Sequence, residues 1–305
     1  MISEPKPSAL IIGSISLDTL NLPMGDAYDL LGGSAAYAAI ACSKLAQPHL
    51  VSAVGADFPS KHRGALDELR IDLAGLRVHD DGQTLAWGAR YDESLSEPEM
   101  LWARLGVFEA FTPEIPTHCR DCRWVLLANL PPLLQRHAWE QLRAPEFIVA
   151  DTMSMWIEAD RESVWSVMCE ADLALMNEAE AILLTGEVDA QASAKALMDG
   201  GAKRVVVKRG AQGALLWIGD DVWEIPAPAT GAVDPTGAGD VLAGGLIGQL
   251  ARTGDTSPRG IIEAAAMGTA LASIVVENFG PSSLTGARPE EIEPRLRDVL
   301  MRVVP

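Results

Sequence analysis

The stretch Asp234-Pro235-Thr236-Gly237-Ala238-Gly239-Asp240 leads directly into an apolar run, residues 241–250, that has the spacing of a helix. Its two glycines allow the backbone to adopt unusual dihedral angles and to pass close to a ligand. The free N–H groups at a helix start attract an anion, and the helix dipole strengthens that attraction. The segment therefore predicts an anion site at the start of a helix.

The carboxylate of Asp240 would lie in the first turn of this helix, where it would repel a bound phosphate. We therefore predict a chemical role for it, the acceptance of a proton from a hydroxyl. The amides of Gly237, Ala238, Gly239 and Asp240 would hold the charge of a phosphoryl group in transfer. An ordinary aspartate has a pKa of about 3.9, so it would accept that proton late in the reaction. The competing interpretation is an acidic first turn that only complements the helix dipole.

Strand-like apolar runs alternate with helix-like segments along the chain, which predicts a mostly parallel sheet covered on both faces. The expected strands are residues 9–12, 49–54, 124–127, 147–150, 173–175 and 204–208, with a hairpin of 214–218 and 222–225. The expected helices are residues 33–45, 61–69, 133–142, 179–184, 191–198, 238–251, 260–276 and 290–299. Residues 84–111 break this pattern, and with residues 14–31 they are expected to form a small β-sheet within a single domain of residues 1–305.

Four further segments accompany the glycine loop in a fixed order. They are Gly13-Ser14-Ile15-Ser16-Leu17-Asp18, the segment 32–45 that opens with Gly32-Gly33, Asn177-Glu178-Ala179-Glu180, and Lys208-Arg209-Gly210-Ala211-Gln212-Gly213. Together the five elements resemble the ribokinase-like (PfkB) family of carbohydrate kinases. The resemblance implies an α/β fold with a small β lid over the acceptor. It also implies an ATP-dependent, Mg²⁺-requiring kinase that phosphorylates a hydroxyl of a sugar, a cyclic polyol or a nucleoside.

The resemblance places the acceptor under the lid. The implied contacts are Asp18, Gly32, Gly33 and Tyr37. Asn129 and Asp151 end two predicted strands and point toward the same crevice, so they are second-tier candidates for an acceptor or phosphate contact. The tryptophans fit core and lid packing, and the alternative is that Trp87 and Trp102 line the acceptor pocket. From the residues alone, Asp18 fits equally a solvated turn, and the glycine pair fits a tight turn. In some members the lid also pairs two subunits, so a homodimer is a further implication.

Tyr37 departs from the family pattern, because many members carry an asparagine there that binds acceptor hydroxyls. A tyrosine is larger and has one polar group, so it favours an acceptor with a flat or apolar face, such as a nucleoside or a cyclic polyol. The alternative is that Tyr37 is a core aromatic residue without contact to the acceptor.

The nucleotide side follows from the same resemblance. The implied contacts are Asn177, Lys208, Gly210, Gly213, Thr236, Gly237, Gly239, Asn278 and Gly280. Glu180 is expected to organise Mg²⁺ through water, and Asp234 stands where some members hold K⁺. The spacing of Asn177 and Glu180 also fits a helix capping box, and Lys208 also fits a solvated lysine.

The net charge of −18 argues against nucleic acid and against an anionic membrane surface as partners, which leaves small molecules. The first predicted strand is not followed by the Gly-x-Gly-x-x-Gly pattern of nicotinamide enzymes, and the phosphate-binding Gly-x-x-x-x-Gly-Lys-Ser/Thr loop is absent from the sequence. A non-catalytic ligand sensor on the same fold stays as an alternative. The intact Asp240 and motif glycines speak against it.

The four cysteines do not suggest a disulfide framework in a chain of 305 residues, and Met1–Pro5 lacks the basic region of a secretory signal, so we expect a cytoplasmic protein. The longest uncharged stretch, residues 264–276, is too short to span a bilayer. His118-Cys119-Arg120-Asp121-Cys122 has a metal-like spacing, but no second ligand pair matches it, and a strand rather than a helix is predicted to follow. We interpret these cysteines as incidental.

Overall fold

The computed structural model describes residues 7–93, 95 and 98–305. Residues 1–6, which include the Met1–Pro5 segment examined for a secretory signal, lie outside this part. So do residues 94, 96 and 97 of the lid region. Two sheets organise the described chain. The larger has nine strands in the order β13-β12-β11-β10-β9-β8-β1-β4-β5, and the smaller has four in the order β3-β2-β6-β7. The expected α/β architecture with a second, small sheet is confirmed.

The central sheet is parallel from β5 to β11 and ends in an antiparallel hairpin, β12 and β13. Its strands are β1 (Ser8–Ile12), β4 (Gln47–Gly55), β5 (Asp72–His79), β8 (Trp124–Leu127), β9 (Phe147–Asp151), β10 (Leu173–Asn177), β11 (Arg204–Lys208), β12 (Ala214–Ile218) and β13 (Asp221–Ile225). Because the parallel strands run the same way, all their carboxyl ends meet at one edge of the sheet, where α/β proteins gather ligands.

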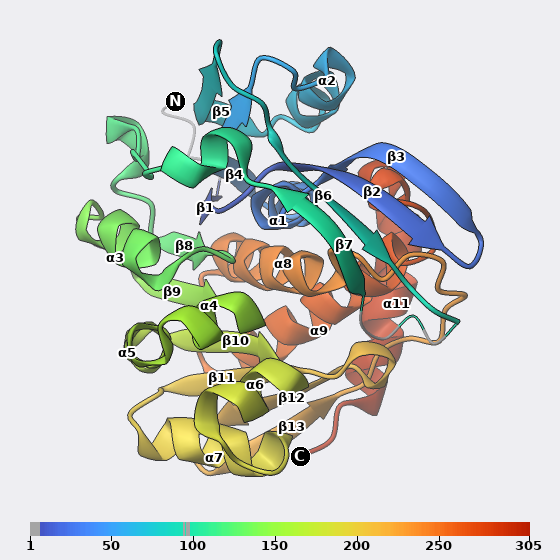
Figure 1. Ribbon diagram of the computed structural model, residues 1–305. Coiled ribbons are helices and arrows are strands. Elements are labelled where there is room, and N and C mark those ends of the chain that lie inside the picture. Colours follow the sequence, from blue (N-terminus) through green and yellow to red (C-terminus); the bar gives the residue numbers. More distant parts are fainter. Residues whose placement is uncertain (1–6, 94, 96–97) are drawn as a thin grey trace, which may run out of the picture.

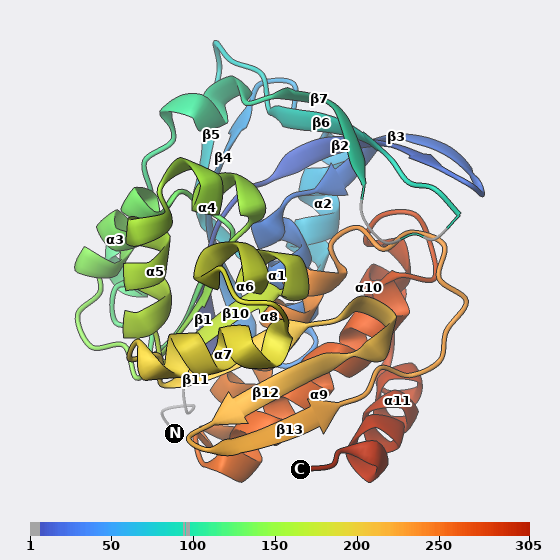
Figure 2. The same ribbon diagram turned by 60° about the horizontal axis from the view of Figure 1, so that its bottom comes forward.

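Helices cover both faces of this sheet, as Figure 2 shows. They are α1 (Ser34–Ser43), α2 (Ser60–Glu68), α3 (Pro132–Glu140), α4 (Ser154–Ala159), α5 (Arg161–Glu170), α6 (Glu178–Thr185), α7 (Ala190–Asp199), α8 (Ala238–Thr253), α9 (Pro258–Val275), α10 (Ser282–Gly286) and α11 (Pro289–Arg302). Successive side chains of a strand point to opposite faces. Ile11 of β1 therefore packs with α1, α8 and α9, whereas Leu10 and Ile12 pack with α3 on the other face.

The smaller sheet, called here the lid sheet, consists of β2 (Ser16–Leu22), β3 (Gly25–Gly32), β6 (Leu85–Arg90) and β7 (Glu99–Arg104). Figure 1 shows its blue and teal strands together at one end of the molecule. Leu20, Leu22, Ala89 and Tyr91 form its own small core, against which Phe279 packs. The expected small sheet is present, with its strands between residues 16 and 32 and between residues 85 and 104, and its role as a lid stays a prediction.

The elements that the pattern did not predict are β5, α4, α5 and α10. Strand β5 forms the edge of the central sheet, and most of its side chains are at least partly exposed, so it lacks the apolar run of an inner strand. Helices α4 and α10 have only six and five residues, too short for an apolar period to show. Within the described residues, no helix is long and apolar enough to cross a membrane.

Candidate active site

The glycine loop ends at Gly237, which caps the N-terminus of α8 in the left-handed conformation with φ of 77°. A Cβ atom at Gly237 would lie 2.5 Å from ring atoms of Tyr37. Both the backbone angle and the close approach of the tyrosine ring therefore require glycine at this position.

Two amides of the first turn of α8 lack a partner among the described residues. Ala238 donates its N–H to the carbonyl of Pro235 at 3.2 Å, and Val241 donates to Gly237 at 2.9 Å. The N–H groups of Gly239 and Asp240 remain at the open end of the helix, where no intrahelical acceptor exists. The predicted anion site therefore loses one of its expected donors, because the N–H of Ala238 is already bound to the carbonyl of Pro235.

A buried lysine faces this helix start. The ammonium group of Lys208, at the end of β11, lies 3.0 and 3.1 Å from the carboxylate oxygens of Asp151, at the end of β9. The side chains are only 14% and 2% exposed, so the interpretation of Lys208 as a solvated residue is wrong. A Cβ at Gly239 would lie 3.1 Å from Lys208 Nζ, which places the charge beside the first turn of α8. Burial lowers the pKa of Lys208, but the carboxylates of Asp151, Glu180 and Asp240 outweigh it and raise the pKa above its ordinary value.

Asp240 itself has an unusual environment. Burial raises its pKa to about 7; the charges of Asp151, Glu180 and Asp18 add to the effect, and Lys208 opposes it. No residue pattern around Asp240 indicates this shift, and the prediction of an ordinary aspartate with a pKa near 3.9 was wrong. A carboxylate with a pKa near neutrality is better matched to accept a proton than one that titrates near 4.

Asp18 lies on the second strand of the lid sheet and is 1% exposed, so it is not a solvated turn residue. Ser16 donates its hydroxyl to Asp18 Oδ1 at 2.5 Å, and Trp87 donates from the neighbouring strand. Burial nevertheless raises the pKa of Asp18 to about 7. A Cβ at Gly32 would overlap the Asp18 carboxylate, which explains the first glycine of the pair.

The ring of Tyr37 lies against Gly237, within the electrostatic reach of Asp18 and Asp240. Its side chain is 2% exposed, and its hydroxyl has no hydrogen-bond partner among the described residues. Burial, followed by the charges of Asp18, Asp234 and Asp240, raises the pKa of Tyr37 well above its usual value. The tyrosine is thus both a core residue and a neighbour of the predicted catalytic groups, so the two interpretations of it are compatible.

The lid sheet is joined to the glycine loop through Tyr91, a residue that the sequence did not single out. Its hydroxyl lies 3.1 Å from the hydroxyl of Thr236. Asp234, 1% exposed, accepts the N–H groups of Thr236 at 2.9 Å and Gly280 at 2.8 Å. Thr236 and Gly280 therefore order the loop around Asp234, and their predicted nucleotide contacts stay predictions.

Asn177 and Glu180 form the expected capping box at the start of α6. The Asn177 side chain accepts from the Glu180 N–H at 2.8 Å, and the Glu180 carboxylate accepts from the Asn177 N–H at 2.7 Å. The cap is therefore confirmed. Glu180 is only 6% exposed, and its charge raises the pKa of both Lys208 and Asp240. Carboxylate oxygens in this position fit Mg²⁺, which prefers oxygen ligands and keeps several of its waters.

Known kinases are similar to this chain in sequence and in fold. Residues 151–286 match the pfkB family carbohydrate kinase. The matched stretch includes Asp151, Asn177, Glu180, Lys208 and the glycine loop that opens α8. It is 28% identical over 283 residues to a cytidine kinase of Thermococcus kodakarensis, which covers 90% of this chain and 98% of that protein.

Solved structures show the same pfkB-type fold. A nucleoside kinase of Methanocaldococcus jannaschii, described as an archaeal member of the ribokinase family, superposes with a TM-score of 0.75 at 20% identity. The match covers 96% of this chain and 98% of that one. A nucleoside kinase of Burkholderia thailandensis, solved in complex with inosine, gives a TM-score of 0.78 at 18% identity with the same coverage.

Other residues predicted from the pfkB pattern lie around this centre with structural partners of their own. Asn129 accepts from the indole of Trp156 at 2.6 Å and donates to the Met153 sulfur at 3.1 Å. Gly33 caps α1 with φ of 94°, and a Cβ there would lie 2.5 Å from the Ser14 carbonyl oxygen. Their contact with an acceptor stays a prediction.

On the nucleotide side, Gly210 and Gly213 flank a short 3₁₀ turn with φ of 54° and 90°. A Cβ at Gly213 would lie 2.0 Å from a backbone oxygen of β13, whereas nothing lies within 4 Å of one at Gly210. The two glycines therefore form a tight turn between β11 and β12. Asn278 is exposed and accepts from the N–H of Phe279. The role of these residues in nucleotide binding stays a prediction.

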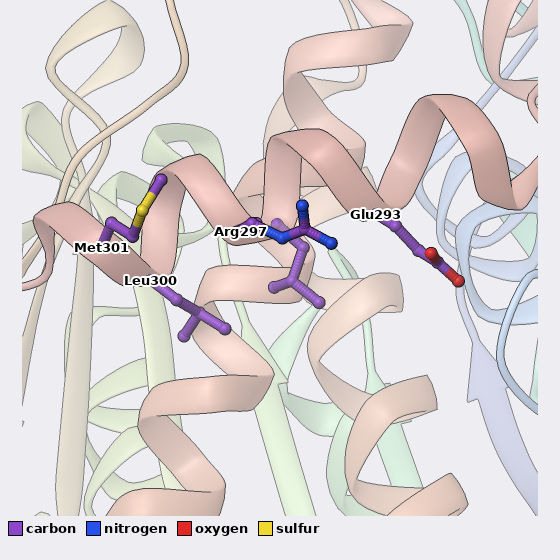
Figure 3. Close-up of a pocket in the computed structure, with 5 residues that line it drawn as sticks. Glu293, Arg297, Leu300 and Met301 are labelled. Atoms are coloured by element: carbon purple, nitrogen blue, oxygen red, sulfur yellow. The ribbon is translucent and has the colours of Figure 1, made fainter.

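A surface hollow of about 440 Å³ lies elsewhere, along α11. Figure 3 shows the side chains of Glu293, Arg297, Leu300 and Met301 extending from this helix. The lining is mainly aliphatic and includes none of the carboxylates that surround Lys208. The hollow therefore does not belong to the candidate active site.

Proposed function

We propose that this chain, working as a single kinase domain with its lid sheet, transfers the γ-phosphoryl group of ATP to a hydroxyl of a nucleoside. The broader activity, ATP-dependent phosphorylation of a sugar or sugar-like alcohol, is that of its family. One observation carries the mechanism. Asp240 lies next to two free helix amides and a buried lysine, and its pKa responds to Asp18 on the lid sheet.

In the proposed reaction, Asp240 takes the proton of the acceptor hydroxyl. The hydroxyl oxygen forms its bond to phosphorus as the bond between the β–γ bridging oxygen and phosphorus breaks, and ADP leaves with that bridging oxygen. The N–H groups of Gly239 and Asp240 and the ammonium of Lys208 stabilise the charge on the phosphoryl oxygens. Mg²⁺ held through Glu180 would neutralise charge on the nucleotide phosphates. Asp18 accepts hydrogen bonds from neighbouring acceptor hydroxyls.

A nucleoside acceptor is supported by two lines. Tyr37, Trp87 and Tyr91 place aromatic side chains around Asp18, Asp234 and Asp240. Flat aromatic surfaces suit a base or other planar group better than a free pentose. The cytidine kinase match spans nearly the whole chain, and the two structures described above are nucleoside kinases.

The test is an ADP-release assay with Mg²⁺ that compares cytidine and inosine with ribose, fructose and myo-inositol, in K⁺ and in Na⁺. We expect the highest kcat/KM with a nucleoside, and Asp240→Asn serves as the blank. A higher value with a free sugar or a polyol would overturn the nucleoside assignment and leave the kinase intact. ADP release that no acceptor increases would instead favour a ligand sensor. A higher turnover in K⁺ than in Na⁺ would support a monovalent cation at Asp234.

A further inference from the structure

A second group of chemically active side chains lies outside the kinase site. His49 is on β4, Asp72 begins β5, and His118 and Cys119 end the 3₁₀ helix η2 (Thr117–Cys119) that precedes β8. The ligand atoms of these four residues all lie within 4.8 Å of one another. Asp72 Oδ2 is 2.6 Å from His49 Nδ1 and 3.0 Å from His118 Nε2. The two imidazole rings meet edge to face, with centroids 5.8 Å apart.

This group belongs to the opposite edge of the sheet from the kinase site. His49 is the third residue of β4 and Asp72 is the first of β5, so both mark the amino ends of parallel strands. Asp151 and Lys208, in contrast, end β9 and β11. The cluster therefore does not serve phosphoryl transfer directly.

The donor set has the composition of a transition-metal site. Two imidazole nitrogens, one carboxylate oxygen and one thiol sulfur form a mixed set of four ligands, which suits tetrahedral Zn²⁺ rather than Mg²⁺ or Ca²⁺. We propose that His49, Asp72, His118 and Cys119 bind one divalent transition-metal ion of the zinc class. The ion joins β4, β5 and the segment before β8 into one unit.

The hydrogen bonds of Asp72 leave one carboxylate oxygen for the ion. Asp72 Oδ1 accepts the N–H of Ala74 at 2.9 Å, and Oδ2 is the oxygen that faces both histidines. Each neutral histidine presents a lone pair once its proton is on the other ring nitrogen. The Cys119 thiol releases its proton to water as the metal–sulfur bond forms, so one proton leaves for each ion bound.

A redox role for the Cys119 and Cys122 pair is the competing explanation. A reactive thiol needs partial exposure and a lowered pKa, usually at a helix start. Cys119 ends a short 3₁₀ helix rather than starting an α-helix, and it is only 1% exposed. Its sulfur lies instead beside nitrogen and oxygen ligands, which favours metal binding.

The experiment titrates the full-length, chelator-treated chain with Co²⁺ in a phosphine reductant, without nucleotide or Mg²⁺. We expect one Co²⁺ per chain, the intense visible bands of tetrahedral cobalt and a thiolate-to-cobalt charge-transfer band. Cys119→Ser should lose the charge-transfer band. His118→Ala, at a half-exposed position, should weaken binding at least about tenfold, because even residues outside the ligand set affect affinity by that factor.

Cys122→Ser and His137→Ala are the matched controls, since Cys122 lies beside the site and His137 is an exposed histidine on α3. Both should keep the parent spectrum, and Zn²⁺ should raise the thermal midpoint of the parent and of the controls but not of Cys119→Ser. Absence of a charge-transfer band in the parent would overturn the proposal. So would a band that survives in Cys119→Ser or disappears in Cys122→Ser. These readouts do not depend on kinase activity, so the two proposals can fail separately.

Discussion

The two edges of the central sheet shift the pKa of an aspartate in opposite directions. At the carboxyl edge, burial and neighbouring carboxylates raise the pKa of Asp240 to about 7. At the amino edge, two histidines and a backbone amide hold the pKa of Asp72 at about 2 against the effect of burial. The same side chain is therefore prepared to accept a proton at one edge and to remain a ligand at the other. What decides is the balance between burial, which raises the pKa of a carboxyl group, and hydrogen-bond donors, which lower it.

The largest effect on this difference between the two edges is expected when the carboxylate of Asp240 is removed. We expect Asp240→Asn to lower kcat by about 10²–10⁴-fold or more, because an amide cannot accept the proton of the hydroxyl. Single-turnover kinetics would measure the loss, and circular dichroism would check that the fold is retained. A kcat equal to that of the parent would remove Asp240 from the mechanism.

The next effect concerns the buried pair beside Asp240. Lys208→Met leaves the 2%-exposed Asp151 without its partner, so we expect the free energy of unfolding to fall by about 3–5 kcal/mol. Urea unfolding measures this quantity. The double variant Asp151→Asn/Lys208→Met is the control, and it should recover part of the loss because no unpaired charge remains. A double variant less stable than Lys208→Met would contradict a buried ion pair.

The pH dependence sharpens the comparison further. Since the ionised form of Asp240 is the base, log kcat/KM should rise with unit slope below pH 7 and level off above about pH 7. Stability should change in the opposite sense. Asp240 and Asp18 keep their protons in the folded state up to about pH 7 but release them near pH 4 when unfolded, so they make stability fall as pH rises between these values. A rate profile that is flat from pH 5 to 8 would refute the raised pKa.

Tyr37→Phe has the smallest expected effect. Its hydroxyl has no partner among the described residues, and an unsatisfied buried hydroxyl is costly, so its removal should raise the free energy of unfolding by about 1 kcal/mol. If the hydroxyl serves the acceptor, the KM for the acceptor should rise while the KM for ATP stays constant. Stability and both KM values together decide the assignment. A loss of stability would mean that the hydroxyl is bound within the fold.

Local signals were sufficient for much of the fold. The buried strands β1, β8, β9, β10 and β11 and the long helices α8 and α9 were predicted because apolar runs and glycine loops mark them. The lid sheet was predicted because residues 84–111 lack a helical period. The edge strand β5 and the helices α4, α5 and α10 were missed. Strand β5 is largely exposed, and α4 and α10 are too short to show an apolar period.

The sequence by itself determined the resemblance to the pfkB kinases, the order of most elements and the glycine loop that opens α8, because these depend on residue types close together in the chain. Only the tertiary structure decided that Lys208 is buried against Asp151, that Asp240 titrates near neutrality and that Tyr37 lies on Gly237. It alone also brought His49 and Asp72 to His118 and Cys119. The reason is physical: charge interactions and ligand geometry depend on distances through space, and these residues are distant in the chain. His49 and Asp72 lie 23 positions apart, and Asp151 and Lys208 lie 57 positions apart.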